Sequence, residues 1–290
     1  WKQAFRELHG AWGSIAVVRV RSLDGREREV RVTRAIEEGR LAGFGNLPPM
    51  RVRVESAPVT TPRGRRAGLI SFNLWMPQID VPFGQAIDKF RSADGLVIDL
   101  RGNPGGLAGM IVGLAGHLIA EPSVLGKTQT RENELVFSVN PRFSTPDGRS
   151  VKPFAGPVAI LVDELSASAT ECFAGALQSL GRVRVFGRQT MGQALPAMTK
   201  RLATGDVLMY ALGDFVTSSG RRLEGDGVIP DEVVPLSIPG LASGRDAALE
   251  AALAWLDKAP LALRPSLLLS SSDLHVRNST RVRRTHLTQE

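Results

Sequence analysis

Cysteine is nearly absent from this chain of 290 residues, since Cys172 is the only one. A single cysteine excludes a disulfide framework and a cysteine-based metal site, and the apolar helical pattern around it, ATECFAGALQ, favours a small core residue. Histidine is also scarce, and no two histidines show the i,i+4 spacing that would place them together on a helix. We therefore expect no metal site from the four, which are His9, His117, His275 and His286.

Long apolar runs are missing as well. No stretch of about 18 uninterrupted apolar residues is present, so we expect no membrane span in the sequence given. The chain opens at Trp1 without the features of a signal peptide, and any signal or anchor would lie upstream of it. An apolar fraction of 43% with 22% charged residues is ordinary for a globular protein, and the length suits one large domain with a smaller piece.

The net charge of +7 raises the question of nucleic-acid binding. However, the basic residues are scattered, and part of the excess lies in the terminal tail. The aromatic residues do not alternate with basic ones, as a base-stacking surface would require. We therefore expect no nucleic-acid partner.

The first 66 residues differ in pattern from the rest. Residues 1–9 have helical spacing, and GSIAVVRVRS and REVRVTRA are alternating strands joined by Asp24-Gly25, a pair typical of a tight hairpin. Residues 37–66 are rich in Gly, Pro and Arg and contain one alternating stretch, MRVRVESA. They are interpreted as a connecting segment that includes a strand.

From Ala67 onward, buried strands alternate with helices. The expected strands are GLISFNLW, GLVIDLRG, GPVAILVDE, RVRVFGRQ and DVLMYALGDFV, and the expected helices are FGQAIDKFRSA, LAGMIVGLAGHLIA, ATECFAGALQSLG and RDAALEAALAWLDK. This order predicts an α/β core with a largely parallel sheet over residues 67–258. Residues 259–290 have no coherent period and are expected to form a disordered tail.

Two strand-to-helix turns are candidates for chemistry. In IDLRGNPGGLAG, the glycines allow backbone N–H groups to point outward, as an anion or oxyanion site requires, although such turns also serve close packing alone. In VDELSASATECFAG, small residues precede a helix whose N-terminus favours negative charge. Ser166 and Ser168 in this turn could carry a nucleophile or could simply cap the helix.

Four blocks together resemble the tail-specific (C-terminal processing) serine peptidases. They are GLVIDLRGNPGG, GPVAILVDELSASATE, GRVRVFGRQTMGQA and GRRLEGDGVIPDEVV, and their order and spacing match the family over roughly residues 67–258. Residues 1–36 are similar to the last helix and two strands of the PDZ module that precedes this core in the family. The resemblance implies a crotonase-like α/β core and peptide-bond hydrolysis without a cofactor.

The resemblance also implies roles for individual residues. The serine of the family signature falls on Ser168, which would be the nucleophile. The backbone N–H of Ala169 and the Gly105–Gly106 turn would form the oxyanion hole. Glu224, in RRLEGDGVIPD, stands where one branch of the family has a glutamate that orients a histidine base; it could instead pair with a neighbouring arginine or face solvent.

One position departs from the best-known members of the family. They use a lysine base in a block that here is TMGQALP, and the aligned residue is Gln193, whose amide cannot take a proton from Ser168. Lys200 is interpreted as a surface lysine at a strand edge. Two explanations remain open: a histidine upstream of Trp1 acts as base, with His9 a weaker candidate, or the chain is a catalytically inactive scaffold that binds peptides or other ligands.

Other polar and aromatic residues are expected to be structural. Arg101 should pair with Asp99 or Asp163, Asn103 should tie down its turn, and His117 should be hydrogen-bonded in the core. Phe72 and Trp75 are expected in the core, although they could instead line the substrate cleft. Asp231 is expected to anchor its loop.

The sequence thus predicts a serine peptidase acting on polypeptides, preferably near an apolar C-terminus. By resemblance it would be periplasmic or otherwise exported. Oligomeric state and substrate preference do not follow from the sequence.

Overall fold

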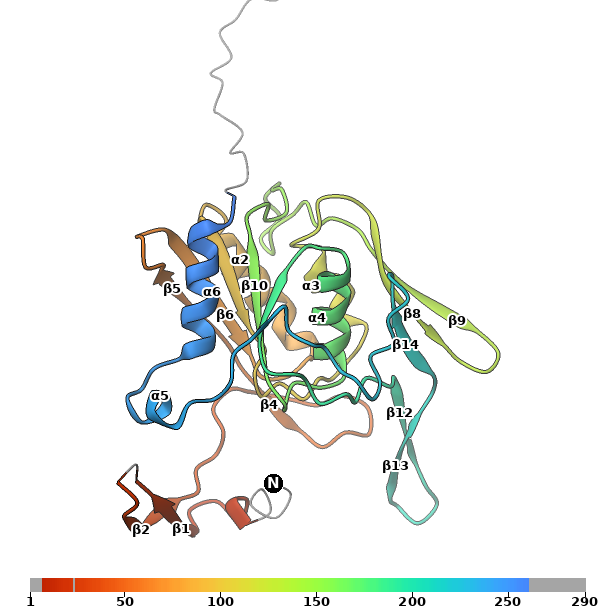
Figure 1. Ribbon diagram of the computed structural model, residues 1–290. Coiled ribbons are helices and arrows are strands. Elements are labelled where there is room, and N and C mark those ends of the chain that lie inside the picture. The colour runs from red at the N-terminus through yellow and green to blue at the C-terminus, as the bar shows by residue number, and fades with distance from the viewer. Residues whose placement is uncertain (1–6, 23, 261–290) are drawn as a thin grey trace, which may run out of the picture.

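The structure is a computed structural model that describes residues 7–22 and 24–260. The predicted tail from residue 261 onward and the first six residues of the predicted N-terminal helix lie outside the described residues. The predicted hairpin is confirmed, with β1 (Ile15–Arg21) antiparallel to β2 (Glu27–Thr33) and Gly25 at a φ of 82° in the turn. Figure 1 shows this hairpin at the lower left, apart from the main sheet.

The main sheet follows the predicted parallel pattern. Its strands are β5 (Val54–Thr60), β6 (Arg66–Phe72), β7 (Gly95–Asp99), β10 (Val158–Val162), β11 (Arg184–Gly187) and β15 (Glu232–Val233). Their order is β15-β11-β10-β7-β6-β5, and all neighbours are parallel except β5, which runs antiparallel along the edge of β6. The strand expected in MRVRVESA is divided between β4 (Met50–Val52), which pairs with β3 (Arg40–Ala42), and β5.

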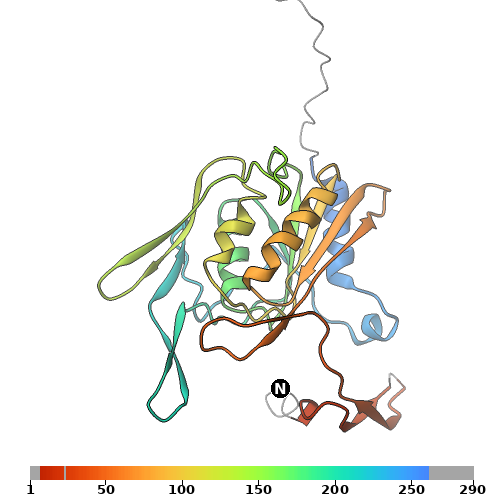
Figure 2. The same ribbon diagram turned by 180° about the vertical axis from the view of Figure 1, so that it is seen from behind.

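Helices cover both faces of this sheet (Figures 1 and 2). They are η1 (Pro77–Ile79), α2 (Asp80–Lys89), α3 (Met110–Ala115), α4 (Ala169–Ser179), α5 (Ile238–Ala242) and α6 (Ala247–Lys258). One face packs against α6, where Leu256 and Ala252 are buried on Val97 and Leu161. The other carries the larger core with α2, α3 and α4. A buried leucine such as Leu256 contributes about 2–5 kcal/mol against alanine.

Local sequence explains where the helices begin and end. Asp246 caps α6 by accepting a hydrogen bond from the N–H of Leu249, and Lys258 completes its last turn. The helix predicted over LAGMIVGLAGHLIA is shorter than expected, since α3 ends at Ala115, just before Gly116. A Cβ atom on Gly116 would come within 2.7 Å of the Asn140 carbonyl, so the chain approaches too closely there for another side chain.

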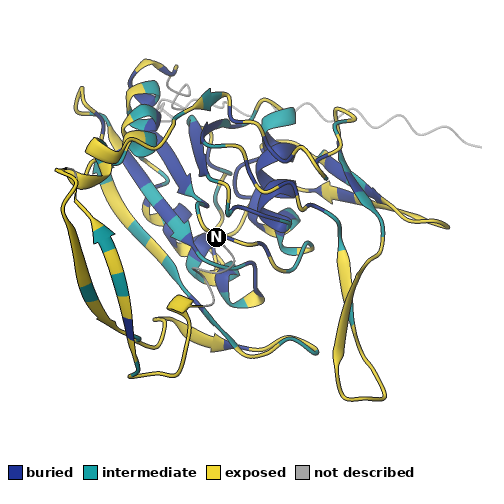
Figure 3. Ribbon diagram, turned by 60° about the horizontal axis from the view of Figure 1, so that its bottom comes forward, coloured by how far each residue is buried: buried dark blue, intermediate teal, exposed yellow. Residues whose placement is uncertain are grey.

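Two hairpins project beyond the core. A second sheet has the order β14-β8-β9, formed by β8 (Ser123–Gln129), β9 (Glu134–Val139) and β14 (Asp214–Thr217). The other hairpin joins β12 (Ala197–Arg201) to β13 (Val207–Ala211), and its side chains are largely exposed (Figure 3). The prediction of one strand over DVLMYALGDFV is therefore wrong, because the chain turns at Leu212 and Gly213 from β13 into β14.

Candidate active site

A cavity of about 620 Å³ lies where the two predicted turns meet. Ser168, Gly106, Gln193 and Glu224 line it together, although they come from four separate segments of the chain. Apolar side chains form much of the remaining wall. They come from the loop between β3 and β4, the glycine turn, the segment before β12 and the β12–β13 hairpin: Phe44, Leu47, Leu107, Leu195, Met198 and Met209.

Ser168 has an unusual backbone conformation. It occupies the N-cap position of α4 with φ 56° and ψ −119°, and it is the one non-glycine residue with positive φ in the described chain. Such a conformation costs about 1–3 kcal/mol and persists only where the surroundings hold it. The side chain is only partly buried, so the hydroxyl is accessible from the cavity. Ser166 is different, because its buried hydroxyl donates to the Leu100 carbonyl at 2.9 Å.

The glycine turn lies directly against Ser168. A Cβ atom on Gly105 would come within 2.6 Å of the Ser168 Cβ atom and 3.0 Å of the Ala169 nitrogen. The N–H of Gly105 donates to Asn103 Oδ1 at 3.0 Å, so it is not free to bind a substrate oxygen. Within the described residues, the N–H groups of Gly106 and Ala169 have no hydrogen-bond acceptor. Of the three predicted oxyanion donors, these two are the available ones.

Glu171 holds the turn that carries Ser168 from the other side. Its buried carboxylate accepts hydrogen bonds from the N–H groups of Ser168 and Gln193 at 3.0 Å each, from Gly192 at 2.7 Å, and from the Thr190 hydroxyl at 2.5 Å. The Ser168 N–H also donates to the Gln193 carbonyl at 2.9 Å. These contacts fix the strained serine to the loop that carries Gln193. We did not predict this role, although Ser-x-x-Glu at a helix start is a known capping pattern.

Glu224 faces the cavity. Its carboxylate neither pairs with a neighbouring arginine nor points to open solvent, the two alternatives considered from the sequence. Its Oε2 accepts the N–H groups of Ala194 at 2.7 Å and Leu195 at 3.1 Å. No hydrogen bond to its Oε1 is present within the described residues. Arg222 places its side chain on Asp214 rather than on the Glu224 carboxylate. The carboxylate therefore steadies the loop after Gln193 and keeps one oxygen available.

No lysine or histidine lines the cavity within the described residues. Lys200 is exposed on β12, as predicted. His117 is buried, and its Nε2 lies 3.2 Å from the guanidinium of Arg142, which is itself bonded to Asp80. Burial and the charge of Arg142 lower the pKa of His117 to about 4. The predicted core role of His117 is confirmed.

The remaining predictions concern structural residues. Arg101 pairs with Asp99 and also with Asp246 at the start of α6, whereas Asp163 accepts the N–H of Gly102. Asp231 anchors its loop through the N–H of Val185. The side chains of Phe72, Trp75 and Cys172 are buried. Phe72 and Trp75 are core aromatics, as one of the two predictions had it, and neither lines the first cavity. Burial raises the pKa of the Cys172 thiol, which makes it unreactive.

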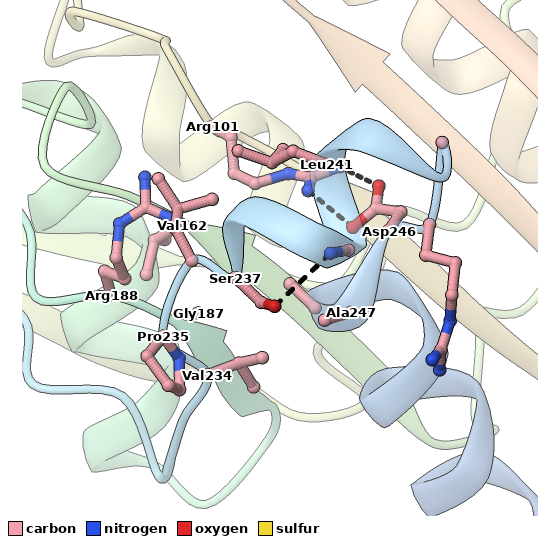
Figure 4. Close-up of a pocket in the computed structure, with 15 residues that line it drawn as sticks. Arg101, Val162, Gly187, Arg188, Val234, Pro235, Ser237, Leu241, Asp246 and Ala247 are labelled. Carbon is pink, nitrogen blue, oxygen red and sulfur yellow. Dashed lines mark hydrogen bonds and ion pairs between the residues drawn. The ribbon is translucent and has the colours of Figure 1, made fainter. Parts of the chain in front are cut away.

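A second cavity, of about 280 Å³, lies under α5 and the first residues of α6 (Figure 4). The Arg101–Asp246 ion pair forms part of its wall, and Val162, Val234 and Leu241 supply apolar surface. None of the four residues that converge at the first cavity lines it. Its described lining residues include neither Ser168 nor the glycine turn, so the first cavity is the candidate active site.

Comparison with known proteins shows to which family the chain belongs. A family model described as peptidase family S41 matches residues 66–234, more than half of the chain. The chain belongs to peptidase family S41. A probable CtpA-like serine protease of Staphylococcus aureus (strain N315) is 27% identical over 219 residues, which are 74% of this chain and 42% of that protein. The same description applies to a protein of Staphylococcus haemolyticus that is 31% identical over 137 residues, or 47% of this chain and 26% of that protein.

Solved structures agree with the fold of this S41 chain. The photosystem II D1 C-terminal processing protease has a TM-score of 0.56 at 23% identity, over 82% of this chain and 62% of that one. A putative S41 protease from Bacteroides fragilis has a TM-score of 0.59 at 15% identity, over 83% of this chain and 65% of that one. These likenesses support a mixed α/β fold. The S41 chain spans about two fifths of the length of the Staphylococcus aureus relative.

The structure contains no helix that could span a membrane within its described residues. It also has no cluster of potential metal ligands there.

Proposed function

We propose that this chain is the catalytic part of a serine peptidase that hydrolyses polypeptides through an acyl-enzyme on Ser168. One observation carries the proposal. A serine held in a strained turn at the N-terminus of α4 directly precedes Ala169 and lines one cavity with Gly106, and the N–H groups of these two neighbours have no acceptor among the described residues. Free amide donors beside a nucleophile are what a tetrahedral intermediate requires.

The reaction would proceed in two halves. The Ser168 hydroxyl attacks the peptide carbonyl, whose oxygen gains negative charge and is stabilised by the N–H groups of Gly106 and Ala169. A base takes the hydroxyl proton and returns it to the leaving amine, after which water hydrolyses the acyl-enzyme by the same path. Each oxyanion donor is worth about 2.7–4 kcal/mol of transition-state stabilisation.

The base in this proposal is a histidine from a part of the protein outside the described residues. The support is the lack of a lysine or histidine around the cavity, together with the available Oε1 of Glu224. A carboxylate at that place would orient an imidazole and stabilise its charged form.

The proposed substrate is an extended polypeptide with apolar residues near its C-terminus. The cavity wall supports the apolar preference, because Phe44, Leu47 and Met209 present apolar surface and Glu224 is the one charged residue among the described residues of the lining. The position near the C-terminus rests on the family resemblance. Two further proposals rest on resemblance: the core over residues 67–258 is crotonase-like after a PDZ-like segment at 1–36, and the protein is exported.

A binding scaffold without catalysis is the second candidate. It is favoured by Gln193, which stands at the position of the family's lysine and cannot accept a proton. Such a protein would use the same apolar cavity to hold a peptide.

Labelling with a fluorophosphonate, read by mass spectrometry, separates the two candidates. The comparison includes this chain, the protein extended upstream of Trp1, and Ser168→Ala and Ser166→Ala variants of the extended protein. We expect labelling at Ser168 in the extended protein and in its Ser166→Ala variant, and none in Ser168→Ala. Folded proteins without label in any form would refute the peptidase and favour the scaffold.

A further inference from the structure

Trp75 lies between the glycine turn and the start of α4, the two segments that carry the candidate oxyanion donors. It follows β6, is completely buried, and contacts the glycine turn through its own backbone. Its N–H donates to the Gly105 carbonyl at 2.9 Å, and its carbonyl accepts the N–H of Leu107 at 2.8 Å. A Cβ atom on Gly106 would come within 2.4 Å of the Trp75 carbonyl oxygen. The position of Gly106 is therefore set by Trp75.

The side chain of Trp75 reaches the start of α4. Its indole N–H donates to the hydroxyl of Thr170 at 2.8 Å, and that hydroxyl donates to Asn103 Oδ1 at 3.0 Å. Thr170 directly follows Ala169, which carries the second amide donor. Asn103 Oδ1 also accepts the Gly105 N–H, so the chain of bonds returns to the glycine turn.

Packing holds the indole ring in one orientation. It contacts Phe72 edge-to-face at a centroid distance of 4.9 Å and Phe173 at 5.0 Å. Thr170 and Asn103 are both completely buried. A ring with two torsions, hydrogen-bonded through its N–H and enclosed by aromatic neighbours, has little freedom to reorient, so it keeps a fixed spacing between the segments it contacts.

We infer that Trp75 is a positioning residue that sets the separation of the two oxyanion donors, through its backbone on one side and the Thr170 hydroxyl on the other. Its backbone holds the turn that presents the Gly106 N–H, and its indole holds the helix start that presents the Ala169 N–H. The kinetic consequence rests on the proposed peptidase function, whereas the structural coupling does not.

The test compares Thr170→Val with Thr170→Ser in the extended protein. Valine has nearly the shape of threonine but cannot bond to Trp75 or Asn103, whereas serine keeps the hydroxyl. We expect Thr170→Val to lower kcat by about 10- to 100-fold with KM little changed, since an ångström of misplacement costs about 100-fold. Thr170→Ser should retain most of the activity. Equal kcat values for the two variants would overturn the inference.

Amide hydrogen exchange supplies a readout that needs no activity. The Gly105 N–H should exchange about tenfold faster in Thr170→Val than in Thr170→Ser, as expected for one weakened hydrogen bond. Trp75→Phe removes the indole N–H and should give the same increase, with no further increase in the double variant Trp75→Phe/Thr170→Val. An unchanged exchange rate would refute the coupling. A protein that shows the exchange effect but has no turnover would refute only the peptidase.

Discussion

Gly105 lies so close to Ser168 that a Cβ atom on Gly105 would come within 2.6 Å of the Ser168 Cβ atom. Gly105 also has a φ of 99°, which side-chain-bearing residues rarely adopt. We predict that Gly105→Ala lowers kcat at least about 100-fold, because Ser168, the proposed nucleophile, must move by a substantial part of an ångström.

Gly102→Ala is the matched control for this prediction. Gly102 has a φ of 69° in the same turn, but no atom lies within 4 Å of an added Cβ. The Gly102→Ala substitution should lower the free energy of unfolding by about 1–2 kcal/mol through backbone strain and leave kcat nearly unchanged. Peptide hydrolysis and thermal unfolding of both variants measure the difference. Equal losses of activity would contradict the close-contact argument.

The β12–β13 hairpin offers a test of substrate contact. Met209 lines the cavity, whereas Leu208, its neighbour along the strand, points to the other face of the hairpin and does not line it. Both are exposed, at 62% and 48%. We predict that Met209→Asp raises KM for an apolar peptide about tenfold, and that Leu208→Asp has little effect. A tenfold change corresponds to about 1.4 kcal/mol, within the value of one buried apolar side chain.

Gln193→Lys should not create an efficient base. Residue 193 is exposed at the cavity, so a lysine there would keep a normal pKa and remain charged near pH 7. A charged ammonium cannot take the proton of Ser168. We predict turnover no higher than that of Gln193→Met, measured with casein from pH 7 to 10. A large gain at pH 7 in the lysine variant alone would disprove this.

His117 predicts a dependence of stability on pH. Its pKa is about 4 in the folded protein against 6.5 in the unfolded chain, because burial and the charges of Arg142 and Arg91 oppose protonation more than Asp80 and Asp88 favour it. The unfolded chain binds the proton more tightly, so stability is complete above about pH 6.5 and falls as the pH decreases to about 4. The total loss is about 3 kcal/mol.

Urea unfolding between pH 4 and 7 measures this loss, with His117→Gln as the control. Glutamine can still accept a hydrogen bond from Arg142 but does not titrate. The free energy of unfolding of this variant should therefore change less with pH over this range. The hydrogen bond from Arg142 lowers the pKa of Asp80, so this carboxylate loses its contribution only at still lower pH. Identical slopes for the two proteins would exclude His117 as the source.

Local patterns were enough to predict the core elements and the two turns. Small residues after a buried strand indicated a turn with Ser166 and Ser168 as candidates, and the glycines indicated a possible anion site. The choice of Ser168 and of the amide donors came from the family resemblance. The structure confirms that Asn103 ties down its turn, since its Oδ1 accepts the Gly105 N–H. The sequence did not indicate that this bond removes Gly105 from the candidate oxyanion donors.

The cavity walls and the supporting contacts were harder to predict. Met198 and Met209 lie on a hairpin with no buried face, so hydrophobic periodicity gave no signal for β12. The bond between Trp75 and Thr170 joins residues 95 positions apart, and only the pairing of β6, β7 and β10 brings them together.

The strand order has a consequence for the timing of activity. Trp75 follows β6, Gly106 follows β7, and Ala169 follows β10, so the amide donors converge only when these three strands lie side by side. A partly folded chain carries Ser168 and Ala169 on a segment that lacks the Gly106 N–H and the Gln193 carbonyl that accepts the Ser168 N–H. The candidate site is thus complete only once these strands have paired. Under the proposed function, an incompletely folded molecule would therefore not cleave neighbouring chains.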